Sequence, residues 1–338
     1  MHYDEIIHYL SGAADAELFA RSRLIKERAV GQKVYLRGLV ELSNVCAKNC
    51  YYCGIRRDNH AVDRYELTEH EVLDSVRLAI DRRYGSVVLQ AGERTDARFI
   101  DFVAHLLTRI KQLPCGADLG ITLSLGEQSE ATYRLWRSAG AVRYLLRMES
   151  FDENLYQQIH PADHLWARRR ECLDLLKKTG YQVGTGVMIG LPGQTLDILA
   201  RDLMAMSQAE IDMCGMGPYV EHAAAPLAAC HSAFAPAQRV ELTLRMVALL
   251  RLMMPTINIA STTALDAIDR GARMRCLAVG ANVVMPNISP TSLRRAYALY
   301  ENKPTEDMDL RSVDVAYGQQ GNSLHYLSRI VSKGASKN

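Results

Sequence analysis

The chain has 338 residues, which suits one large α/β barrel or two domains of average size. Its 40 basic and 38 acidic residues leave a net charge of +2, which excludes a strong electrostatic case for nucleic acid or an anionic membrane as the main partner. Eight cysteines are too few for a disulfide scaffold, and no stretch has the pattern of an export signal or a membrane span. We therefore expect a cytoplasmic protein with reduced thiols.

The predicted elements follow one another in a regular alternation. Residues 1–30 mix polar and apolar positions and predict one or two N-terminal helices. Residues 31–300 alternate short runs rich in Val, Ile and Leu with longer amphipathic stretches. The predicted strands cover residues 34–42, 86–90, 121–125, 142–148, 183–189, 213–216, 256–259 and 282–285. The predicted helices cover residues 68–83, 96–111, 127–138, 165–179, 195–209, 235–253 and 265–279. Residues 301–338 are polar and predict a C-terminal extension that frays from about Ser332 onward.

The alternation predicts the fold class. The clearest helix signal begins at Thr68, which has the capping-box spacing to Glu71. Eight strands that alternate with helices without a linker predict a parallel (β/α)8 TIM barrel of class α/β, with a doubly wound open sheet as the alternative. In such barrels the C-terminal ends of the strands carry the chemistry. The unusual polar residues of this chain lie at those positions: Cys46, Cys50, Cys53, Gln90, Gly92, Glu93, Thr122, Ser124, Arg147, Glu149, Thr262 and Thr263.

Three cysteines form a C-x3-C-x2-C motif at Cys46, Cys50 and Cys53. Three thiolates on one short loop can hold three irons of a [4Fe-4S] cluster and leave the fourth iron open to a small molecule. A closed zinc site needs a fourth ligand, and His60, the nearest histidine, lies seven residues beyond the motif. The other cysteines are scattered and predict small buried side chains: Cys115, Cys172, Cys214, Cys230 and Cys276.

The motif, with Tyr52 directly before its third cysteine, resembles that of the radical S-adenosylmethionine (SAM) superfamily. The resemblance implies a [4Fe-4S] cluster whose open iron binds the amino and carboxylate groups of SAM. It also implies reductive cleavage of SAM to methionine and a 5′-deoxyadenosyl radical. Because no cysteine follows Cys276, we expect a single cluster.

Longer segments resemble the [FeFe]-hydrogenase maturase family HydE and the related methylornithine synthases, within a group that includes biotin synthase. These segments are residues 41–46, 53–59, 88–93, 122–127 and 190–195. Residues 215–219, 260–264 and 280–287 are more similar to the maturases. The resemblance extends over about residues 33–303.

The resemblance also implies roles for individual side chains. Gln90, Gly92 and Glu93 occupy the segment that meets the SAM amino group, where a carboxylate or a carbonyl accepts from an ammonium. Glu149 is expected to accept from the amino group or the ribose. Arg169, chosen from the basic run at residues 168–170, is assigned to the SAM carboxylate. The alternative for that run is a solvated helix face.

The remaining predicted contacts line the barrel. Tyr52, Thr122, Ser124, Arg147 and Met285 are expected to contact the cofactor, and Met285 lies where the family packs the adenine. Substrate contacts are expected from Thr262, Thr263 and Arg147. Hydroxyl groups on strands can equally satisfy the backbone. Tyr297 and Tyr300 follow the barrel and are expected near one of its mouths.

Two positions depart from the family pattern. The frequent Arg-His-Glu at the fourth strand reads Arg147, Met148 and Glu149 here, which removes a titrating group from the expected cavity edge. Ala91 replaces a serine in the segment at residues 90–93. Because of Met148, the identity of the substrate is not determined by the resemblance.

The function that the resemblance implies is maturation of the di-iron subcluster of [FeFe]-hydrogenase. The substrate is then a small organometallic complex supplied by a partner maturase, with transient contacts to other maturases. A methylornithine-synthase-like carbon-skeleton mutase acting on an amino acid is the alternative enzyme. A cluster-carrying scaffold without SAM chemistry is the alternative outside the enzymes.

Overall fold

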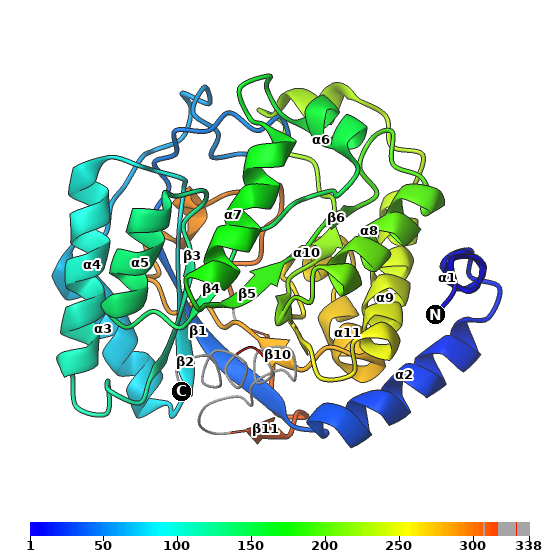
Figure 1. The fold of residues 1–338 in the computed structure, drawn as a ribbon, viewed down its shortest axis with the longest axis horizontal. Helices are drawn as coiled ribbons and strands as arrows, with labels where there is room; N and C mark the ends of the chain where they lie inside the picture. The colour runs from blue at the N-terminus through cyan, green and yellow to red at the C-terminus, as the bar shows by residue number, and fades with distance from the viewer. Residues whose placement is uncertain (307, 317–328, 330–338) are drawn as a thin grey trace, which may run out of the picture.

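The computed structural model describes residues 1–306, 308–316 and 329. In this part of the chain a parallel sheet is rolled into a barrel with helices around it (Figure 1). The barrel strands are β1 (Val34–Ser43), β2 (Ser86–Ala91), β3 (Gly120–Ser124), β4 (Arg143–Leu145), β5 (Gln182–Thr185), β7 (Met213–Cys214), β9 (Asn258–Ile259) and β10 (Val283–Val284). The fraying predicted from Ser332 onward lies outside the described residues.

The sheet closes on itself. Its hydrogen-bonded order is β10-β1-β2-β3-β4-β5-β7-β9, and all these neighbours are parallel. A parallel bridge between Ala260 and Val283 joins the two ends of this order. The predicted (β/α)8 barrel is therefore confirmed, and the open sheet is excluded.

Three short strands extend the barrel. β6 (Met188–Ile189) pairs with β8 (Gly217–Pro218) beyond β5 and β7. β11 (Val315–Ala316) pairs with the start of β1. The predicted strand at residues 183–189 is thus two strands, because the chain leaves the ladder after Thr185 and pairs again at Met188.

Eleven α-helices occur in the described residues. They are α1 (Tyr3–Leu10), α2 (Asp15–Val30), α3 (Glu69–Asp81), α4 (Ala97–Gln112), α5 (Glu130–Ser138), α6 (Glu153–Ile159), α7 (Trp166–Lys178), α8 (Leu196–Gln208), α9 (Pro236–Met253), α10 (Ala264–Ile268) and α11 (Ala272–Val279). Two 3-10 turns, η1 (Pro226–Ala229) and η2 (Arg294–Ala296), accompany them. None of the described helices is long and apolar enough to cross a bilayer.

Local chemistry sets the helix boundaries. The predicted capping box at Thr68 and Glu71 is present in both directions. The helix predicted from residue 127 begins instead at Glu130, because the Ser129 side chain accepts from the Thr132 N–H. The helix predicted at residues 265–279 is two helices, because Gly271 adopts a φ of +96° between them.

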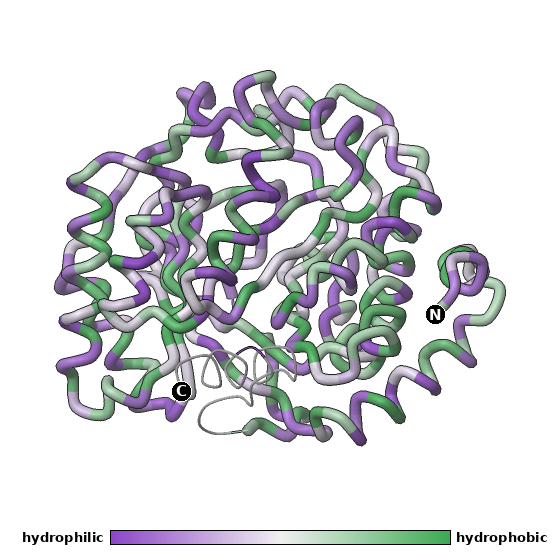
Figure 2. Tube along the Cα trace, viewed as in Figure 1, coloured by the Kyte–Doolittle hydropathy of each residue, from purple (hydrophilic) through white to green (hydrophobic). Residues whose placement is uncertain are grey.

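The core lies between the barrel and its helices. Figure 2 shows hydrophobic segments along the central strands and hydrophilic positions on the outer turns of the helices. Arg251 of α9 is fully buried and donates to the carbonyls of Pro255, Ile257 and Gly280. These hydrogen bonds therefore connect α9 to the segments that precede β9 and β10.

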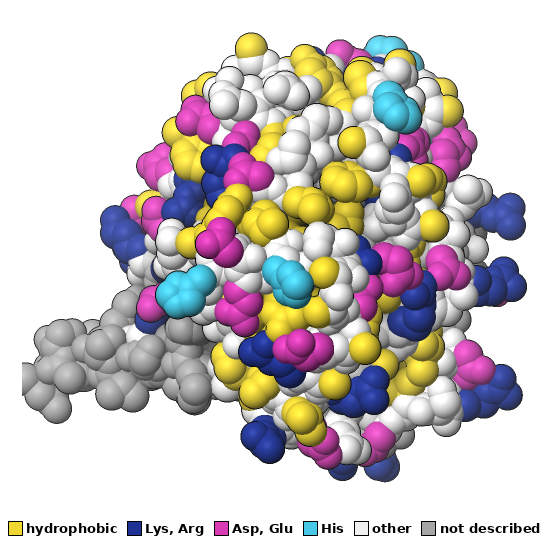
Figure 3. Space-filling model, turned by 90° about the vertical axis from the view of Figure 1, so that its right-hand side faces the viewer, with side chains coloured by type: hydrophobic (Ala, Val, Ile, Leu, Met, Phe, Trp, Pro, Cys, Tyr) yellow, Lys and Arg dark blue, Asp and Glu magenta, His cyan; other side chains and the backbone are white. Residues whose placement is uncertain are grey.

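The face on the right of Figure 1 has a mixed surface. Figure 3 shows basic and acidic side chains interspersed there with apolar ones. No extended region of one sign covers this view, as the near-equal numbers of basic and acidic residues predict.

Candidate active site

A cavity of about 310 Å³ opens at the C-terminal ends of the barrel strands. Its size lies at the lower end of the usual range for small-molecule sites. With one exception, Thr122, every predicted site residue lines it: Cys46, Cys50, Tyr52, Cys53, Gln90, Gly92, Glu93, Ser124, Arg147, Glu149, Arg169, Thr262, Thr263 and Met285. The barrel therefore gathers side chains that are more than two hundred positions apart in the sequence.

The cysteine loop follows β1 and is held by its backbone. The guanidinium of Arg64 donates to four loop carbonyls, those of Asn44, Ile55, Arg56 and Asn59, at 2.6–3.0 Å. Such a fork of donors makes the loop rigid before any ligand arrives. The sequence analysis missed Arg64, although an arginine eleven residues beyond the motif was visible.

The same loop lies directly on the end of β2. The Ala47 N–H donates to the Glu93 carbonyl at 2.8 Å. A Cβ atom at Gly92 would lie 2.3 Å from the Val45 carbonyl oxygen and 2.7 Å from the Cys46 Cβ. Only glycine permits this approach, so Gly92 shapes the site through its missing side chain.

The sulfur donors fit an iron–sulfur cluster. Cys46, Cys50 and Cys53 are free thiols on one wall of the cavity. Burial raises the pKa of the Cys50 thiol to about 12, so its thiolate requires nearby positive charge such as iron supplies. Three thiolates beside an open cavity suit a [4Fe-4S] cluster with one free iron position. Of the remaining cysteines, Cys115 and Cys230 are exposed, which corrects the prediction that all five are buried.

Two histidines stand behind Cys50, and His60 is not one of them. His60 is exposed, whereas ligand-type atoms of Cys50, His160 and His164 lie within 4.8 Å of one another. Both nitrogens of His160 have partners, the Tyr156 carbonyl at 2.9 Å and the Tyr52 hydroxyl at 3.0 Å. Burial lowers the pKa of His160 to about 3 and that of His164 to about 4, so both rings are neutral. The sequence analysis missed both.

Four charged side chains form a compact cluster at the cavity wall, which we call the ion quartet: Lys48, Glu93, Glu127 and Arg169. Arg169 contacts Glu127 at 2.7 Å and Glu93 at 3.6 Å. Lys48 contacts the same carboxylates at 3.2 and 3.3 Å. Two buried carboxylates are thus compensated by two cations.

The two carboxylates of the ion quartet differ in their pKa. Burial raises the pKa of Glu93 above its ordinary value, although Arg169 opposes this. Burial acts in the same direction on Glu127, but Arg169 and Lys48 outweigh it and lower the pKa of Glu127. Lys48 and Glu127 were not predicted as site residues. Their positions could have indicated a site role, because Lys48 lies inside the cysteine motif and Glu127 follows the end of the third predicted strand.

Only one arginine of the basic run reaches the cavity. Arg169 lines it, whereas Arg168 pairs with Glu171 at 2.7 Å and Arg170 lies over the Phe151 ring at 5.4 Å. Of the three arginines, the structure therefore brings Arg169 to the cavity, and its role toward SAM stays a prediction.

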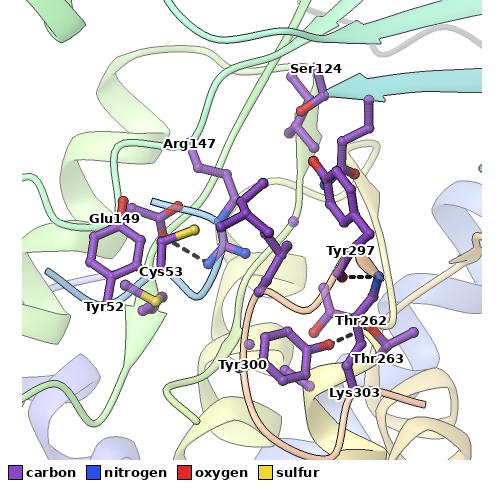
Figure 4. Close-up of a pocket in the computed structure, with 18 of the residues that line it drawn as sticks. Tyr52, Cys53, Ser124, Arg147, Glu149, Thr262, Thr263, Tyr297, Tyr300 and Lys303 are labelled. Carbon is purple, nitrogen blue, oxygen red and sulfur yellow. Dashed lines mark hydrogen bonds and ion pairs between the residues drawn. The ribbon is translucent and has the colours of Figure 1, made fainter. Parts of the chain in front are cut away.

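A second ion pair stands beside Cys53. Arg147 contacts Glu149 at 2.9 Å, and Figure 4 shows the pair between Tyr52 and the centre of the cavity. Glu149 has a φ of +64°, an uncommon conformation for a residue other than glycine. Burial raises its pKa. Arg147 lines the cavity and offers its guanidinium charge there, while its Nε is buried and has no hydrogen-bond partner among the described residues.

The opposite wall comes from the loop after β9 and from residues beyond the barrel strands (Figure 4). Thr263 and Tyr300 share a hydrogen bond of 2.6 Å between their hydroxyls. Gln90 donates to the Tyr297 hydroxyl at 3.3 Å, and Lys303 donates to the Tyr297 carbonyl at 2.7 Å. Residues 297–303 therefore form part of the site, on the same side as the mouth of the barrel.

Two predicted positions lie elsewhere. Thr122 is buried and lines a separate hollow of about 20 Å³ deeper in the barrel, so the structure does not bring it to the cavity. Met148 is fully buried in the hydrophobic core and does not line the cavity, because its neighbours Arg147 and Glu149 take the inward positions. Met148 therefore contributes no group to the cavity lining.

The sequence matches known proteins over most of its length. A family model described as the radical SAM superfamily matches residues 40–203. The chain is 41% identical to the [FeFe] hydrogenase maturase subunit HydE of Thermotoga maritima over 85% of this chain and 79% of that protein. It is 26% identical to 3-methylornithine synthase of Methanosarcina barkeri over 88% of this chain and 81% of that protein.

Solved structures share the fold. The structure of methylornithine synthase (PylB) superposes with a TM-score of 0.74 at 20% identity, covering 99% of this chain and 93% of that chain. The FeFe-hydrogenase maturase HydG from Carboxydothermus hydrogenoformans gives a TM-score of 0.74 at 19% identity, covering 100% of this chain and 75% of that chain. At these identities the likeness concerns the barrel alone.

Proposed function

We propose that this chain, which belongs to the radical SAM superfamily and is an enzyme, is HydE-like. Its proposed role is maturation of the di-iron subcluster of [FeFe]-hydrogenase. The observation that carries the proposal is the cavity, where three cysteines face polar side chains of the HydE-like segments. The 41% identity to HydE over most of both chains supports the same function.

Membership of the superfamily implies a [4Fe-4S] cluster and SAM as cofactors. We propose one cluster, held by Cys46, Cys50 and Cys53. Cluster and SAM together supply a single electron transfer that breaks a carbon–sulfur bond of the sulfonium and yields a 5′-deoxyadenosyl radical. The protein contributes a largely apolar surrounding for this chemistry, because Cys50 and Cys53 are half-buried and desolvation raises the pKa of both thiols.

The ion quartet is proposed to hold the amino-acid end of SAM. Glu93 and Gln90 accept from its ammonium, and Arg169 donates to its carboxylate. Glu127 orients the guanidinium of Arg169 through the contact of 2.7 Å. Glu149 is proposed to accept from the ribose or the amino group, with Ser124 and Met285 as further contacts.

The substrate is proposed to lie between Arg147 and the loop after β9. Thr262 and Thr263 offer hydroxyls there, and Arg147 offers the positive charge of its guanidinium. This donor set suits a small, anionic organometallic complex rather than a macromolecule. Transfer of such a complex from a partner maturase requires only a transient contact.

A mutase that acts on an amino acid is the second candidate, favoured by the 26% identity to methylornithine synthase. Arg147 and Glu149 form a pair of opposite charges that can hold an amino acid's carboxylate and ammonium.

One experiment separates these functions. The protein is reconstituted anaerobically with iron and sulfide, reduced with dithionite, and incubated with SAM. We expect 5′-deoxyadenosine, and we expect the protein to restore activity to a hydrogenase maturation mixture that lacks only its HydE component. Absence of 5′-deoxyadenosine despite a formed cluster would refute SAM cleavage. Formation of methylornithine from lysine, without hydrogenase activation, would favour the mutase.

Thr263→Val provides a matched variant for the substrate assignment. It removes the hydroxyl that bonds Tyr300 and leaves the cysteines and the ion quartet unchanged. We expect hydrogenase activation to fall while SAM binding stays at the wild-type level. Equal loss of both would place Thr263 in the cofactor site instead.

A further inference from the structure

The three cysteines of the motif differ in the donors that reach their sulfur atoms. The Glu93 backbone N–H donates to the Cys46 Sγ at 3.3 Å. Cys50 instead has an imidazole beside it, with the Nδ1 of His164 at 3.8 Å from its Sγ, within hydrogen-bonding reach of sulfur. Substituting the Glu93 side chain leaves the backbone donor to Cys46 in place, whereas substituting His164 removes the imidazole donor beside Cys50.

The tautomer of His164 follows from its second nitrogen. The backbone N–H of Asn49 donates to the Nε2 of His164 at 3.5 Å, and the exposed Asp163 carboxylate lies farther from the same nitrogen, at 3.7 Å, beyond hydrogen-bond distance. Since Nε2 accepts this bond in a neutral ring, the proton resides on Nδ1, which faces Cys50. The ring therefore offers an N–H group to the sulfur.

The loop between α6 and α7 holds this ring in place. The His164 N–H donates to the Pro161 carbonyl at 2.9 Å. The ring lies 5.8 Å from the ring of His160, which is itself stacked on Tyr156 at 4.0 Å. Only 4% of His164 is exposed, so its hydrogen bond is shielded from water.

The position of His164 separates it from the ligand space. Cys50 lines the cavity and His164 does not, so the imidazole stands behind the sulfur rather than beside SAM or the substrate. Any effect of His164 on the chemistry must therefore pass through the Cys50 sulfur or its loop.

We propose that His164 is a positioning residue that donates an N–H···S hydrogen bond to Cys50 and thereby raises the reduction potential of the cluster. Reduction adds one negative charge to the cluster and its thiolates, and a donor to sulfur stabilises that charge. The inference rests on the proposed binding of the cluster by Cys46, Cys50 and Cys53, and it is independent of the substrate.

The test is a redox titration of the reconstituted, SAM-free protein, followed by electron paramagnetic resonance. His164→Phe removes the donor and keeps a ring. We expect the equilibrium constant for one-electron reduction to fall about tenfold, which corresponds to about 59 mV. His164→Asn, whose amide N–H lies near the position of Nδ1, is expected to recover most of the potential. His60→Phe, at an exposed histidine of the loop that carries the three cysteines, is the matched control and is expected to leave the potential unchanged.

A potential in His164→Phe equal to that of the wild type would overturn the inference. So would a lowered potential that His164→Asn shares in full, because packing rather than the donor would then be responsible.

A second measurement decides the matter if His164→Phe does not bind the cluster. In wild-type protein with ¹⁵N-labelled histidine, electron spin-echo envelope modulation of the reduced cluster is expected to show a coupled histidine nitrogen. Its absence would refute the hydrogen bond. If the wild type itself forms no cluster, the proposed function fails, and this outcome is distinct from a formed cluster without histidine coupling.

Discussion

The two ends of the barrel both bury arginine side chains, yet they use them differently. At the mouth, defined by the cavity at the C-terminal strand ends, Arg169 faces the carboxylates of Glu93 and Glu127. At the base, defined by the hollow of about 20 Å³, Arg37 contacts the Met213 sulfur at 3.0 Å and Arg143 contacts the Gln182 amide oxygen at 3.1 Å.

The electrostatic consequences are opposite. Burial acts to lower the pKa of Arg169, but Glu93 and Glu127 outweigh it and raise the pKa well above the ordinary value. Burial, with a contribution from Arg143, lowers the pKa of Arg37 well below it. The difference teaches that the mouth pairs Arg169 with two carboxylates beside an open volume, whereas among the described contacts at the base Arg37 lies against a thioether sulfur and Arg143 against an amide oxygen. Charges that will meet a ligand need partners while the ligand is absent.

The largest expected effect compares a cysteine at each end. Cys50→Ala removes a proposed iron ligand at the mouth, and we expect complete loss of the cluster and of 5′-deoxyadenosine formation. Cys214→Ala, at the base, is expected to keep the cluster and to lower the free energy of unfolding by about 1–2 kcal/mol. Iron content, the visible spectrum and denaturant unfolding measure these outcomes. Unchanged iron loading in Cys50→Ala would contradict the assignment of Cys50 as an iron ligand.

The next effect compares an arginine at each end. Arg169→Met leaves Glu93 and Glu127 with Lys48 as the remaining cation of the ion quartet, and we expect a loss of about 3–5 kcal/mol in unfolding free energy. SAM affinity, measured by calorimetry, is expected to fall with it. Arg143→Met is expected to cost about 1–2 kcal/mol and to leave SAM affinity unchanged. Equal losses of unfolding free energy and of SAM affinity in the two variants would show that the arginines at the mouth and at the base of the barrel have the same role.

A pH effect distinguishes the compensated carboxylates at the mouth from a buried carboxylate outside it. Asp202 of α8 accepts from the Phe151 N–H at 2.7 Å and from the Ser150 hydroxyl at 3.4 Å, and no cation bonds to it among the described residues. Burial raises the pKa of Asp202 to about 8, from an ordinary value of 3.8. Between these values the folded state binds the proton more tightly, so the unfolding free energy of the wild type falls as pH rises.

Asp202→Asn removes this titration and keeps an acceptor for the Phe151 N–H. We expect the variant to gain about 1–3 kcal/mol relative to the wild type between pH 5 and pH 8, with no relative gain below pH 3.8. Urea unfolding at several pH values measures the difference. A constant difference across this range would contradict the assignment.

The smallest effect compares two residues of one strand. Ser124 lines the cavity at the mouth, and Thr122 lines the hollow at the base with a buried hydroxyl that has no hydrogen-bond partner among the described residues. Ser124→Ala is expected to weaken SAM binding by about 1 kcal/mol, roughly fivefold. Thr122→Val is expected to leave binding unchanged and to stabilise the fold slightly, because an unpaired hydroxyl is replaced by a methyl group. Weaker binding in Thr122→Val would restore the contact predicted from sequence.

The sequence predicted most of the site because barrel chemistry depends on strand ends. Spacing located the cysteine loop and the end of each strand, and the family resemblance added Tyr52, Arg169 and Met285; fourteen of the predicted residues line one cavity. It failed for Thr122, because Thr122 and Ser124 point to the same interior and differ only in depth. It also placed Met148 at the cavity edge, although strand alternation beside Arg147 and Glu149 indicated the opposite face.

The positions of other candidate-site residues depend on long-range contacts, although Tyr297 and Tyr300 were expected near one mouth of the barrel. Residues 297–303 lie in a polar stretch after the last strand, and their return over the cavity depends on contacts such as Lys303 with Glu41, 262 positions away. His164 is 114 positions from Cys50 and belongs to a loop whose sequence shows no motif. Long-range packing of this kind is not encoded in the spacing of neighbouring residues.

The sequence alone determined the (β/α)8 alternation and the placing of three cysteines on one loop, since both depend on residues close together in the chain. The tertiary structure alone decided which of three consecutive arginines enters the cavity, how the ion quartet compensates its charges, and which sulfur has an imidazole behind it. The physical reason is that burial, charge pairing and hydrogen bonding depend on neighbours in space, and closing the barrel is what makes distant residues neighbours.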